Sequence, residues 1–324
     1  MAYIVGTVNS LQGLKAAIEE ALSNEGWSTE LEFLVKNGLY MKFTVVGDGL
    51  TPPSKLTALV GNSPTDTAPA TPAVGPVRSY KDGAASPWSW PITYNMHILD
   101  NPLEVYVILR YGSFVQTLAF GQSPAEGNNG SGNWVHGFHM APASRQIYPN
   151  DMALFPYGSV VVGNYSAGAI YTLTIPFFSS TVTYSSSMES GQPSLMHGAI
   201  SSTGEIGWSD PRVAMTSYDN KGLSSALTLQ PLLGLQPNTW NGEAVLLSCQ
   251  IFQGRPERKI SLIGELSHYR ILRNDYLPDG SIITLGPDRW KIYPAYRRNT
   301  EKRDAGAFQD HSGTIAFAIR YDGP

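Results

Sequence analysis

The sequence predicts a mainly β protein, in which a small N-terminal β-α-β-β unit precedes a β-sandwich-like or barrel-like domain with long loops. Three observations predict this class. Charged residues make up only 15% of the 324-residue chain and aromatic residues 11%, while Gly and Pro number 32 and 23. From residue 91 onward, short runs of β-branched and aromatic residues alternate with clusters of Gly, Pro, Asn and Ser, as in sandwiches and barrels. Only one segment, near the start, has a convincing helical period.

The N-terminal unit is expected to cover residues 1–55. Its helix has an apolar face at helical spacing, made of Leu11, Leu14, Ile18, Ala21 and Leu22. Ser10 is a suitable N-cap and Gly26 a suitable stop. Two short strands within residues 31–46 are expected to meet at Asn37-Gly38, a strong hairpin dipeptide. One helix over a small sheet buries little, so this unit is expected to pack on something larger.

Residues 56–90 are expected to form a connector, because 61–87 have no apolar period and are rich in Pro, Ala and Thr. Residues 91–324 are expected to form the β-rich domain. Its strand-like runs include residues 104–111, 114–120, 159–162, 169–175, 244–252, 260–263, 282–285 and 314–320. Ser, Gly, Asn and Gln dominate residues 185–235. We interpret these as long loops within one domain, with a break between two β domains as the alternative.

The composition argues against several partners. The net charge is −4, so nucleic-acid binding has no electrostatic support, and the one basic run, 297–303, is interpreted as a solvated loop or a contact between subunits. No apolar stretch approaches the ~20 residues that span a bilayer, and the start lacks the pattern of a signal peptide. Synthesis and folding in a cytoplasm are therefore expected. Cys249 is the only cysteine and is expected to be a core residue.

His136 and His139 are the candidate metal ligands, because two histidines three residues apart can share an ion. No cluster of Cys, Asp or Glu lies near them in the sequence, and the preceding residues 127–133 form a Gly- and Asn-rich loop. A metalloprotease helix would also need a Glu beside the first histidine. A packed aromatic–glycine loop is the favoured interpretation, and neither a metal nor a cofactor is expected.

The candidates for catalysis are equally isolated. They are His268 with Asp275, His311 with Asp310 beside Ser312, and the loop acids Glu126, Glu205 and Asp210. No Gly-X-Ser-X-Gly turn exposes a serine, and linear spacing cannot show that acid and base groups converge. Solvated loop acids are the commoner case. No catalytic residue is therefore predicted, and the chain is expected not to be an enzyme.

The tryptophans have two readings. They are Trp27, Trp88, Trp90, Trp134, Trp208, Trp240 and Trp290. Exposed aromatic rings beside Asn or Asp form sugar-binding surfaces, which Trp88-Ser89-Trp90 or Trp208-Ser209-Asp210 would suit. Aromatic rings also fill cores and anchor interfaces. For any single tryptophan, a core or interface position is favoured.

Two N-terminal strings resemble the opening of a family of tailed-bacteriophage and prophage virion structural proteins. They are Ala21-Leu22-Ser23-Asn24-Glu25-Gly26-Trp27 and Leu34-Val35-Lys36-Asn37-Gly38-Leu39-Tyr40. Further similar strings are Glu104-Val105-Tyr106, Leu118-Ala119-Phe120-Gly121, Asn241-Gly242-Glu243-Ala244-Val245-Leu246, Gly264-Glu265-Leu266-Ser267-His268-Tyr269-Arg270, Thr284-Leu285-Gly286-Pro287-Asp288-Arg289-Trp290 and Ala318-Ile319-Arg320-Tyr321-Asp322-Gly323-Pro324. The similarity is least clear in residues 61–90 and 180–240. The family supplies no catalytic residues to transfer.

The resemblance implies a non-enzymatic structural component of a virion, in the tail or baseplate, assembled in the host cytoplasm. Its partners would be other virion structural proteins and copies of itself, since a surface with few charges suits burial against neighbours. A neck or capsid-associated protein is the alternative position. A carbohydrate-binding or receptor-binding β module, with a host-surface glycan as partner, is the alternative function, and a glycan-degrading enzyme on a β scaffold comes third.

Overall fold

The structure is a computed structural model that describes most of the chain. The described residues are 1–47, 54–69, 71–75, 90–111, 114–123, 125–126, 129–137, 140–141, 152–155, 159–164, 169–174, 189–190, 194–199, 205–208, 223–224, 246–255, 259–273, 277–294 and 315–324. The predicted mainly β class is confirmed. Within these ranges there is one α-helix, α1 (Leu11–Asn24), and the strands pair antiparallel. No helix in the described ranges has the length and apolarity needed to cross a membrane.

Three sheets have five or more strands. The N-terminal sheet has the spatial order β2 (Ser28–Glu30), β3 (Phe33–Lys36), β4 (Leu39–Val46), β5 (Lys55–Gly61) and β6 (Ala73–Val74). The central sheet has the order β1 (Ala2–Val8), β7 (Ile92–Leu99), β8 (Glu104–Tyr111), β9 (Phe114–Gln122), β10 (Asn133–Gly137), β16 (Ser194–Ala199) and β17 (Ile206–Trp208). The C-terminal sheet has the order β18 (Leu223–Ser224), β19 (Leu247–Arg255), β20 (Lys259–Arg273), β23 (Ile315–Arg320), β22 (Asp288–Pro294) and β21 (Ile282–Leu285).

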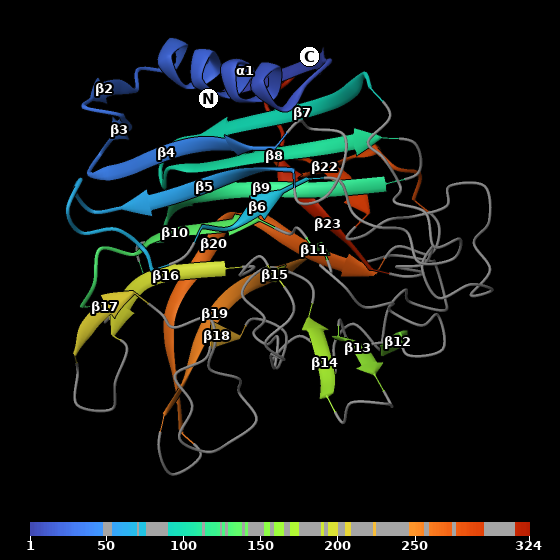
Figure 1. Ribbon diagram of the computed structural model, residues 1–324. Coiled ribbons are helices and arrows are strands. Elements are labelled where there is room, and N and C mark those ends of the chain that lie inside the picture. The colour runs from blue at the N-terminus through green and yellow to red at the C-terminus, as the bar shows by residue number, and fades with distance from the viewer. Residues whose placement is uncertain are drawn as a thin grey trace.

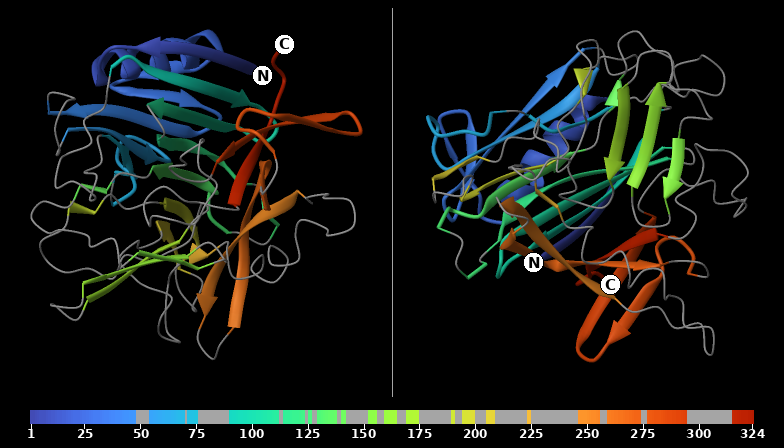
Figure 2. Two further views of the ribbon diagram at one scale, coloured as in Figure 1. Left: turned by 90° about the vertical axis from the view of Figure 1, so that its right-hand side faces the viewer. Right: turned by 90° about the horizontal axis from the view of Figure 1, so that it is seen from below.

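Two smaller sheets complete the described strands. One pairs β11 (Met140–Ala141) with β15 (Glu189–Ser190), and the other contains β12 (Met152–Phe155), β13 (Ser159–Asn164) and β14 (Ala169–Thr174). The three larger sheets are layered (Figure 1). In the left view of Figure 2 the blue N-terminal elements, the green central sheet and the orange-red C-terminal sheet follow one another across the molecule.

The helix α1 begins and ends where the sequence predicts. The Ser10 side chain caps it by accepting a hydrogen bond from the Gly13 backbone N–H at 2.9 Å. Gly26 follows with φ 82°, a left-handed conformation that glycine adopts without strain. The predicted apolar face is buried in full. That face packs against both the N-terminal and the central sheet, as expected for a unit too small to form a core alone.

The predicted hairpin is also present. Asn37 and Gly38 join β3 to β4 with φ values of 52° and 77°, as a two-residue turn of the primed type requires. The first strand of the unit behaves differently. β1 pairs along its whole length with β7, from Ala2 opposite Ile98 to Val8 opposite Ile92. The N-terminal unit therefore shares a sheet with the domain that follows it.

Part of the segment expected to be a connector, residues 56–90, belongs to the N-terminal sheet. β5 pairs with β4 over its full length, and β6 returns to pair with β5, with Leu56 opposite Val74. The side chains of Leu56, Ala58 and Val60 are fully buried, and this period-2 pattern was a strand signal. Residues 76–89 lie outside the described part of the chain.

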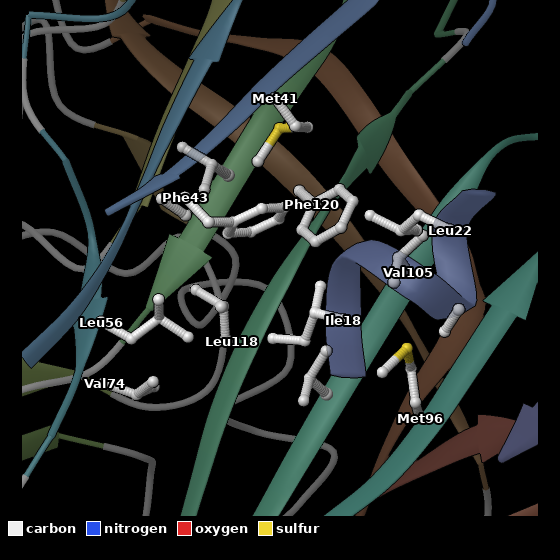
Figure 3. Packing of buried hydrophobic residues seen from close by; sticks show 14 of the residues in the cluster. Ile18, Leu22, Met41, Phe43, Leu56, Val74, Met96, Val105, Leu118 and Phe120 are labelled. Atoms are coloured by element: carbon white, nitrogen blue, oxygen red, sulfur yellow. The ribbon is translucent and has the colours of Figure 1, made fainter. Parts of the chain in front are cut away.

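The middle strands of the central sheet are covered on both faces. On β8, Val105, Val107 and Leu109 belong to a first core, shared with α1 and the N-terminal sheet. Tyr106 and Ile108 point the other way, into a second core shared with the C-terminal sheet. A strand buried on both faces has no polar alternation, which explains the continuous apolar run of β8. Figure 3 shows the first core, where Phe43 and Phe120 meet between α1 and the two sheets.

Stacked aromatic rings connect the sheets in the second core. The ring of Tyr106 stacks on that of Tyr269 at 5.9 Å between centroids, and Phe317 stacks on Tyr269 at 5.4 Å and on Tyr293 at 5.6 Å. Each offset pair contributes about 1 kcal/mol beyond its buried area. The second core therefore joins the central and C-terminal sheets tightly.

Gly121 in β9 tests the tightness of this packing. A Cβ atom added there would lie 2.9 Å from Glu104 Cα and closer still to the Leu103 carbonyl oxygen. Because these are backbone atoms, Gly121→Ala is expected to lower the free energy of unfolding by about 2 kcal/mol. Urea unfolding of Gly121→Ala and the wild type measures this loss of stability.

Gly13 in α1 is the matched control for Gly121. A Cβ atom there would lie 3.3 Å from Ser10 Oγ and 3.7 Å from Val8 Cβ, with no backbone atom among its nearest neighbours, and alanine favours helix over glycine by about 1 kcal/mol. Gly13→Ala should therefore leave stability unchanged or raise it. Equal stability of Gly121→Ala and the wild type would contradict the packing described for β9.

Candidate functional site

Of the two candidate metal ligands, His136 lies in the described part of the chain. His136 lies in β10 with 9% of its surface exposed, between Ala119 of β9 and Ser194 of β16. His139 lies outside the described residues. Within the described ranges, no three His, Cys, Asp or Glu side chains are grouped so as to hold a metal ion.

The candidates for acid–base chemistry occupy different environments. His268 is 2% exposed, and its Nε2 lies 3.2 Å from the Pro102 carbonyl oxygen. Burial lowers the pKa of this imidazole. Glu126 and Glu205 are exposed. The remaining candidates lie outside the described residues: Asp210, Asp275, Asp310, His311 and Ser312. The basic run 297–303 lies outside them too.

The predicted core position of Cys249 is confirmed, since it is fully buried in the second core. The preference for core positions is confirmed for three tryptophans: Trp27, Trp134 and Trp290. Two others are half-buried at the rim of the first core: Trp90 and Trp208. The last two, Trp88 and Trp240, lie outside the described residues. Of the two predicted sugar-binding strings, the second therefore contributes a described residue that lies in a strand. This residue is Trp208, which is partly exposed in β17.

Glu104, at the start of β8, is the one fully buried carboxylate among the described residues. It accepts hydrogen bonds from the backbone N–H of Ser267 at 2.7 Å and of His268 at 3.0 Å, and from the Tyr106 hydroxyl at 2.6 Å. Burial raises the pKa of Glu104 to about 7, against the opposing effect of these bonds and of the Arg270 charge. Without the three donors, burying this group would be far more costly.

The two backbone donors belong to a bulge in β20. Ser248 of β19 pairs with Arg270, while the next residue, Cys249, pairs with Leu266, so residues 267–269 have no partner in β19. The Arg270 guanidinium turns back and donates to the carbonyl oxygens of residues 266, 267 and 269 at 3.2, 3.0 and 2.8 Å. Glu104 therefore fastens the central sheet to a bulge. This arrangement is a joint between sheets rather than an open site.

His97 in β7 forms a second joint. Its Nε2 lies 2.7 Å from the Tyr293 hydroxyl, and its Nδ1 lies 3.2 Å from the Arg320 carbonyl oxygen. Because a carbonyl oxygen only accepts, Nδ1 carries the proton and Nε2 accepts from Tyr293. Burial lowers the pKa of His97 to about 3, and the nearby Lys291 charge acts in the same direction, against the bond to Arg320.

Cationic side chains surround this joint. The Lys291 ammonium donates to the Tyr3 hydroxyl at 2.7 Å and lies 4.5 Å from the Tyr3 ring centroid and 4.9 Å from that of Tyr321. The Arg110 guanidinium binds both oxygens of Asp279, at 2.5 and 2.6 Å. Strands β1, β7 and β8 are thereby tied to the C-terminal sheet.

The third group lies at the surface, beside β17. The polar–aromatic cluster consists of Asn62, Asp66, Ser131, His197 and Trp208. The indole N–H of Trp208 donates to Asp66 Oδ1 at 3.1 Å, and the Asn62 amide donates to Asp66 Oδ2 at 2.7 Å. The Ser131 hydroxyl donates to Asn62 Oδ1 at 2.7 Å. The His197 and Trp208 rings, opposite each other on β16 and β17, meet edge-on with centroids 5.1 Å apart.

Asn133 holds the polar–aromatic cluster from below. Its buried amide donates to Asn62 Oδ1 at 2.9 Å and to the Gly38 carbonyl oxygen at 3.0 Å. The Ser131 backbone N–H donates to His197 Nδ1 at 3.0 Å, so the His197 proton is on Nε2. Burial lowers the pKa of His197, whereas the negative charge of Asp66 acts in the opposite direction. The effect of burial is the larger of the two and favours the neutral ring.

No protein-family model matches the chain, and no curated protein is similar to it in sequence.

Sequence reasoning singled out Trp208 but missed Glu104, His97 and the partners of Trp208 in the polar–aromatic cluster. Glu104 had a signal, because a carboxylate directly precedes a run of apolar residues in β8. His97 similarly lies within the apolar strand β7. The partners of Trp208 had no such signal, because they come from segments far apart in the sequence.

Proposed function

We propose that this chain is a non-enzymatic structural subunit of a tailed-bacteriophage particle, in the tail or baseplate, that assembles with copies of itself and with other virion proteins. The resemblance of the sequence to virion structural proteins supports a place in a phage particle. The observation that carries the assembly role is the free edge of the C-terminal sheet. A neck or capsid-associated position, and receptor binding, are the alternatives for the same chain.

Strand β21 forms that edge. It pairs with β22 on one side, and among the described residues no strand pairs with its other side. Ile282 and Leu285 are 43% and 50% exposed. The hairpin β21–β22 stands out from the body of the molecule in the left view of Figure 2.

The sequence of β21 lacks the usual protection against pairing with another chain. Edge strands commonly carry Lys, Pro or a bulge that prevents such pairing, whereas Ile282, Ile283, Thr284 and Leu285 include none of these. An antiparallel pair of two identical strands is two-fold symmetric, so β21 is complementary to itself. A stable interface needs roughly 800 Å² per partner, more than a four-residue strand supplies. We infer that β21 initiates a contact that the neighbouring surface extends.

Charged substitutions on β21 test this role. The double variant Ile282→Lys, Leu285→Lys is expected to raise the dissociation constant of the oligomer at least ~10-fold, equivalent to about 1.4 kcal/mol. Two apolar contacts are lost, and like charges face each other across the symmetric pair. Sedimentation velocity over a range of micromolar protein concentrations measures the effect.

Leu31→Lys is the matched control. Leu31 is 79% exposed but lies in the turn between β2 and β3, so its replacement should leave association unchanged. A wild-type protein that sediments as a monomer at every concentration, and does not co-sediment with a particle fraction, would contradict the proposed function.

A further inference from the structure

We propose that the polar–aromatic cluster is a binding site for a neutral glycan, which would lie against the half-exposed Trp208 ring with its hydroxyl groups on Asp66, Asn62 and His197. The inference does not depend on the assembly role of β21, because the two surfaces belong to different sheets. In Figure 1 β17 lies at the lower left, at the far end of the central sheet from β1.

The aromatic ring is fixed before any ligand arrives. Its indole N–H is held by Asp66 Oδ1, one edge meets His197, and the ring packs on the rim of the first core. The Asp66 carboxylate is fixed in turn by the Asn62 amide. The Asn62 backbone N–H also donates to the Asp66 carbonyl oxygen at 2.8 Å. A site ordered in advance does not lose binding energy to the ordering of its side chains.

The cluster retains unused hydrogen-bonding capacity among the described residues. A carboxylate has about four acceptor positions, and Asp66 uses one on Trp208 and one on Asn62. The Asn62 amide has a second N–H beyond the one that Asp66 accepts. His197 Nε2–H has no acceptor in the described part of the chain, since the contacts of this ring engage Nδ1.

This mixture of groups selects the chemical class of the ligand. A sugar hydroxyl both donates and accepts, and Asp66 offers acceptors beside the donors of Asn62 and His197. The C–H face of a sugar ring suits the apolar face of an indole. An anionic ligand is disfavoured, because the cluster contains a carboxylate and no Lys or Arg. A metal ion is disfavoured by the single carboxylate.

A purely structural joint would explain the hydrogen bonds but not the exposed apolar surface around them. Ile206 precedes Trp208 by two residues on β17, so both side chains point to the same face of the strand. Ile206 is 51% exposed. A joint gains nothing from leaving an isoleucine and part of an indole in water, whereas a sugar-binding surface requires such a platform.

Titration with single sugars tests the site. The probes are glucose, galactose and N-acetylglucosamine, followed by isothermal titration calorimetry and by the indole N–H signals in NMR spectra of the full chain. We expect at least one sugar to bind with a dissociation constant on the order of 1 mM, shifting the Trp208 signal. Asp66→Ala and Trp208→Ala should each weaken binding at least ~10-fold, and the anionic sugar glucuronate should bind more weakly than glucose.

Two further variants separate binding from folding. Trp208→Phe keeps an aromatic face but loses the bond to Asp66, so it should retain measurable binding even if Trp208→Ala unfolds. The variant Ile282→Lys, Leu285→Lys leaves the cluster intact and should bind sugar like the wild type, whatever its oligomeric state. The proposal is overturned if none of the three sugars shows saturable binding when its concentration is raised well above ~1 mM. It is also overturned if Asp66→Ala and Trp208→Ala bind sugar as well as the wild type does.

Discussion

Glu104→Ala is expected to lower the free energy of unfolding by about 4 kcal/mol at neutral pH, because each buried polar group left without a partner costs about 1 to 3 kcal/mol. The groups are the backbone N–H of Ser267 and of His268 and the hydroxyl of Tyr106, all of which donate to this carboxylate. No water replaces the acceptor easily, since Tyr106 is fully buried. Urea unfolding at pH 7 measures the loss.

The pH dependence of Glu104 gives a sharper result. Its folded-state pKa of about 7 lies above the ordinary value of 4.5, so the folded protein holds this proton more tightly than the unfolded chain. Its contribution to stability is greatest below pH 4.5 and declines as pH rises to about 7, by roughly 3 kcal/mol in total. Glu104→Gln removes the titrating group. As pH rises from 5 to 7, the free energy of unfolding of the wild type should therefore fall relative to that of Glu104→Gln.

Glu126→Gln is the control for this experiment, because Glu126 is exposed. Its unfolding free energy should stay within about 0.5 kcal/mol of the wild-type value and follow the wild-type pH dependence. A wild-type advantage over Glu104→Gln that stays constant from pH 5 to 8 would show that Glu104 does not titrate as the geometry indicates.

Acidification is expected to destabilise the protein through His97. The folded-state pKa of about 3 lies below the ordinary value of 6.5, so the unfolded chain takes up the proton first. The stability that neutral His97 contributes is complete above pH 6.5 and is lost as pH falls toward 3, by as much as roughly 5 kcal/mol. The Lys291 charge beside Tyr3 also disfavours a cationic imidazole here.

The test is the variant His97→Gln, which cannot be protonated. It should be less stable than the wild type at pH 7, because the contacts with Tyr293 and Arg320 are altered, but should lose less stability between pH 6.5 and 4. His197→Gln serves as the comparison. His197 is only half-buried, so its removal should change the acid dependence far less. Identical acid dependence of His97→Gln and the wild type would refute this role.

Local chemistry made the N-terminal elements predictable. The spacing of Leu14, Ile18 and Leu22, the Ser10 cap and the Asn37-Gly38 turn each act within a few residues, and all appear as predicted. The buried position of Cys249 was predictable because it lies in an apolar strand-like run, whose side chains are expected to be in the core. β5 was missed because the Pro-rich residues that follow it obscured the alternation of Leu56, Ala58 and Val60.

The candidate sites were not predictable in the same way. Glu104 meets a bulge more than a hundred residues away, and Trp208 meets Asp66 of the loop that follows β5. Such contacts depend on which strands become neighbours, and sequence periodicity does not specify that.

The sequence by itself determined a mainly β chain, one capped helix, one tight turn and a set of residues that must be buried, because these follow from backbone preferences and short-range periodicity. Only the tertiary structure decided that the middle strands of the central sheet are buried on both faces. It also decided that Glu104 and His97 join the sheets and that Trp208 remains partly exposed among Asp66, Asn62 and His197. The physical reason is that a polar or aromatic side chain acquires its role from partners that folding brings from distant parts of the chain.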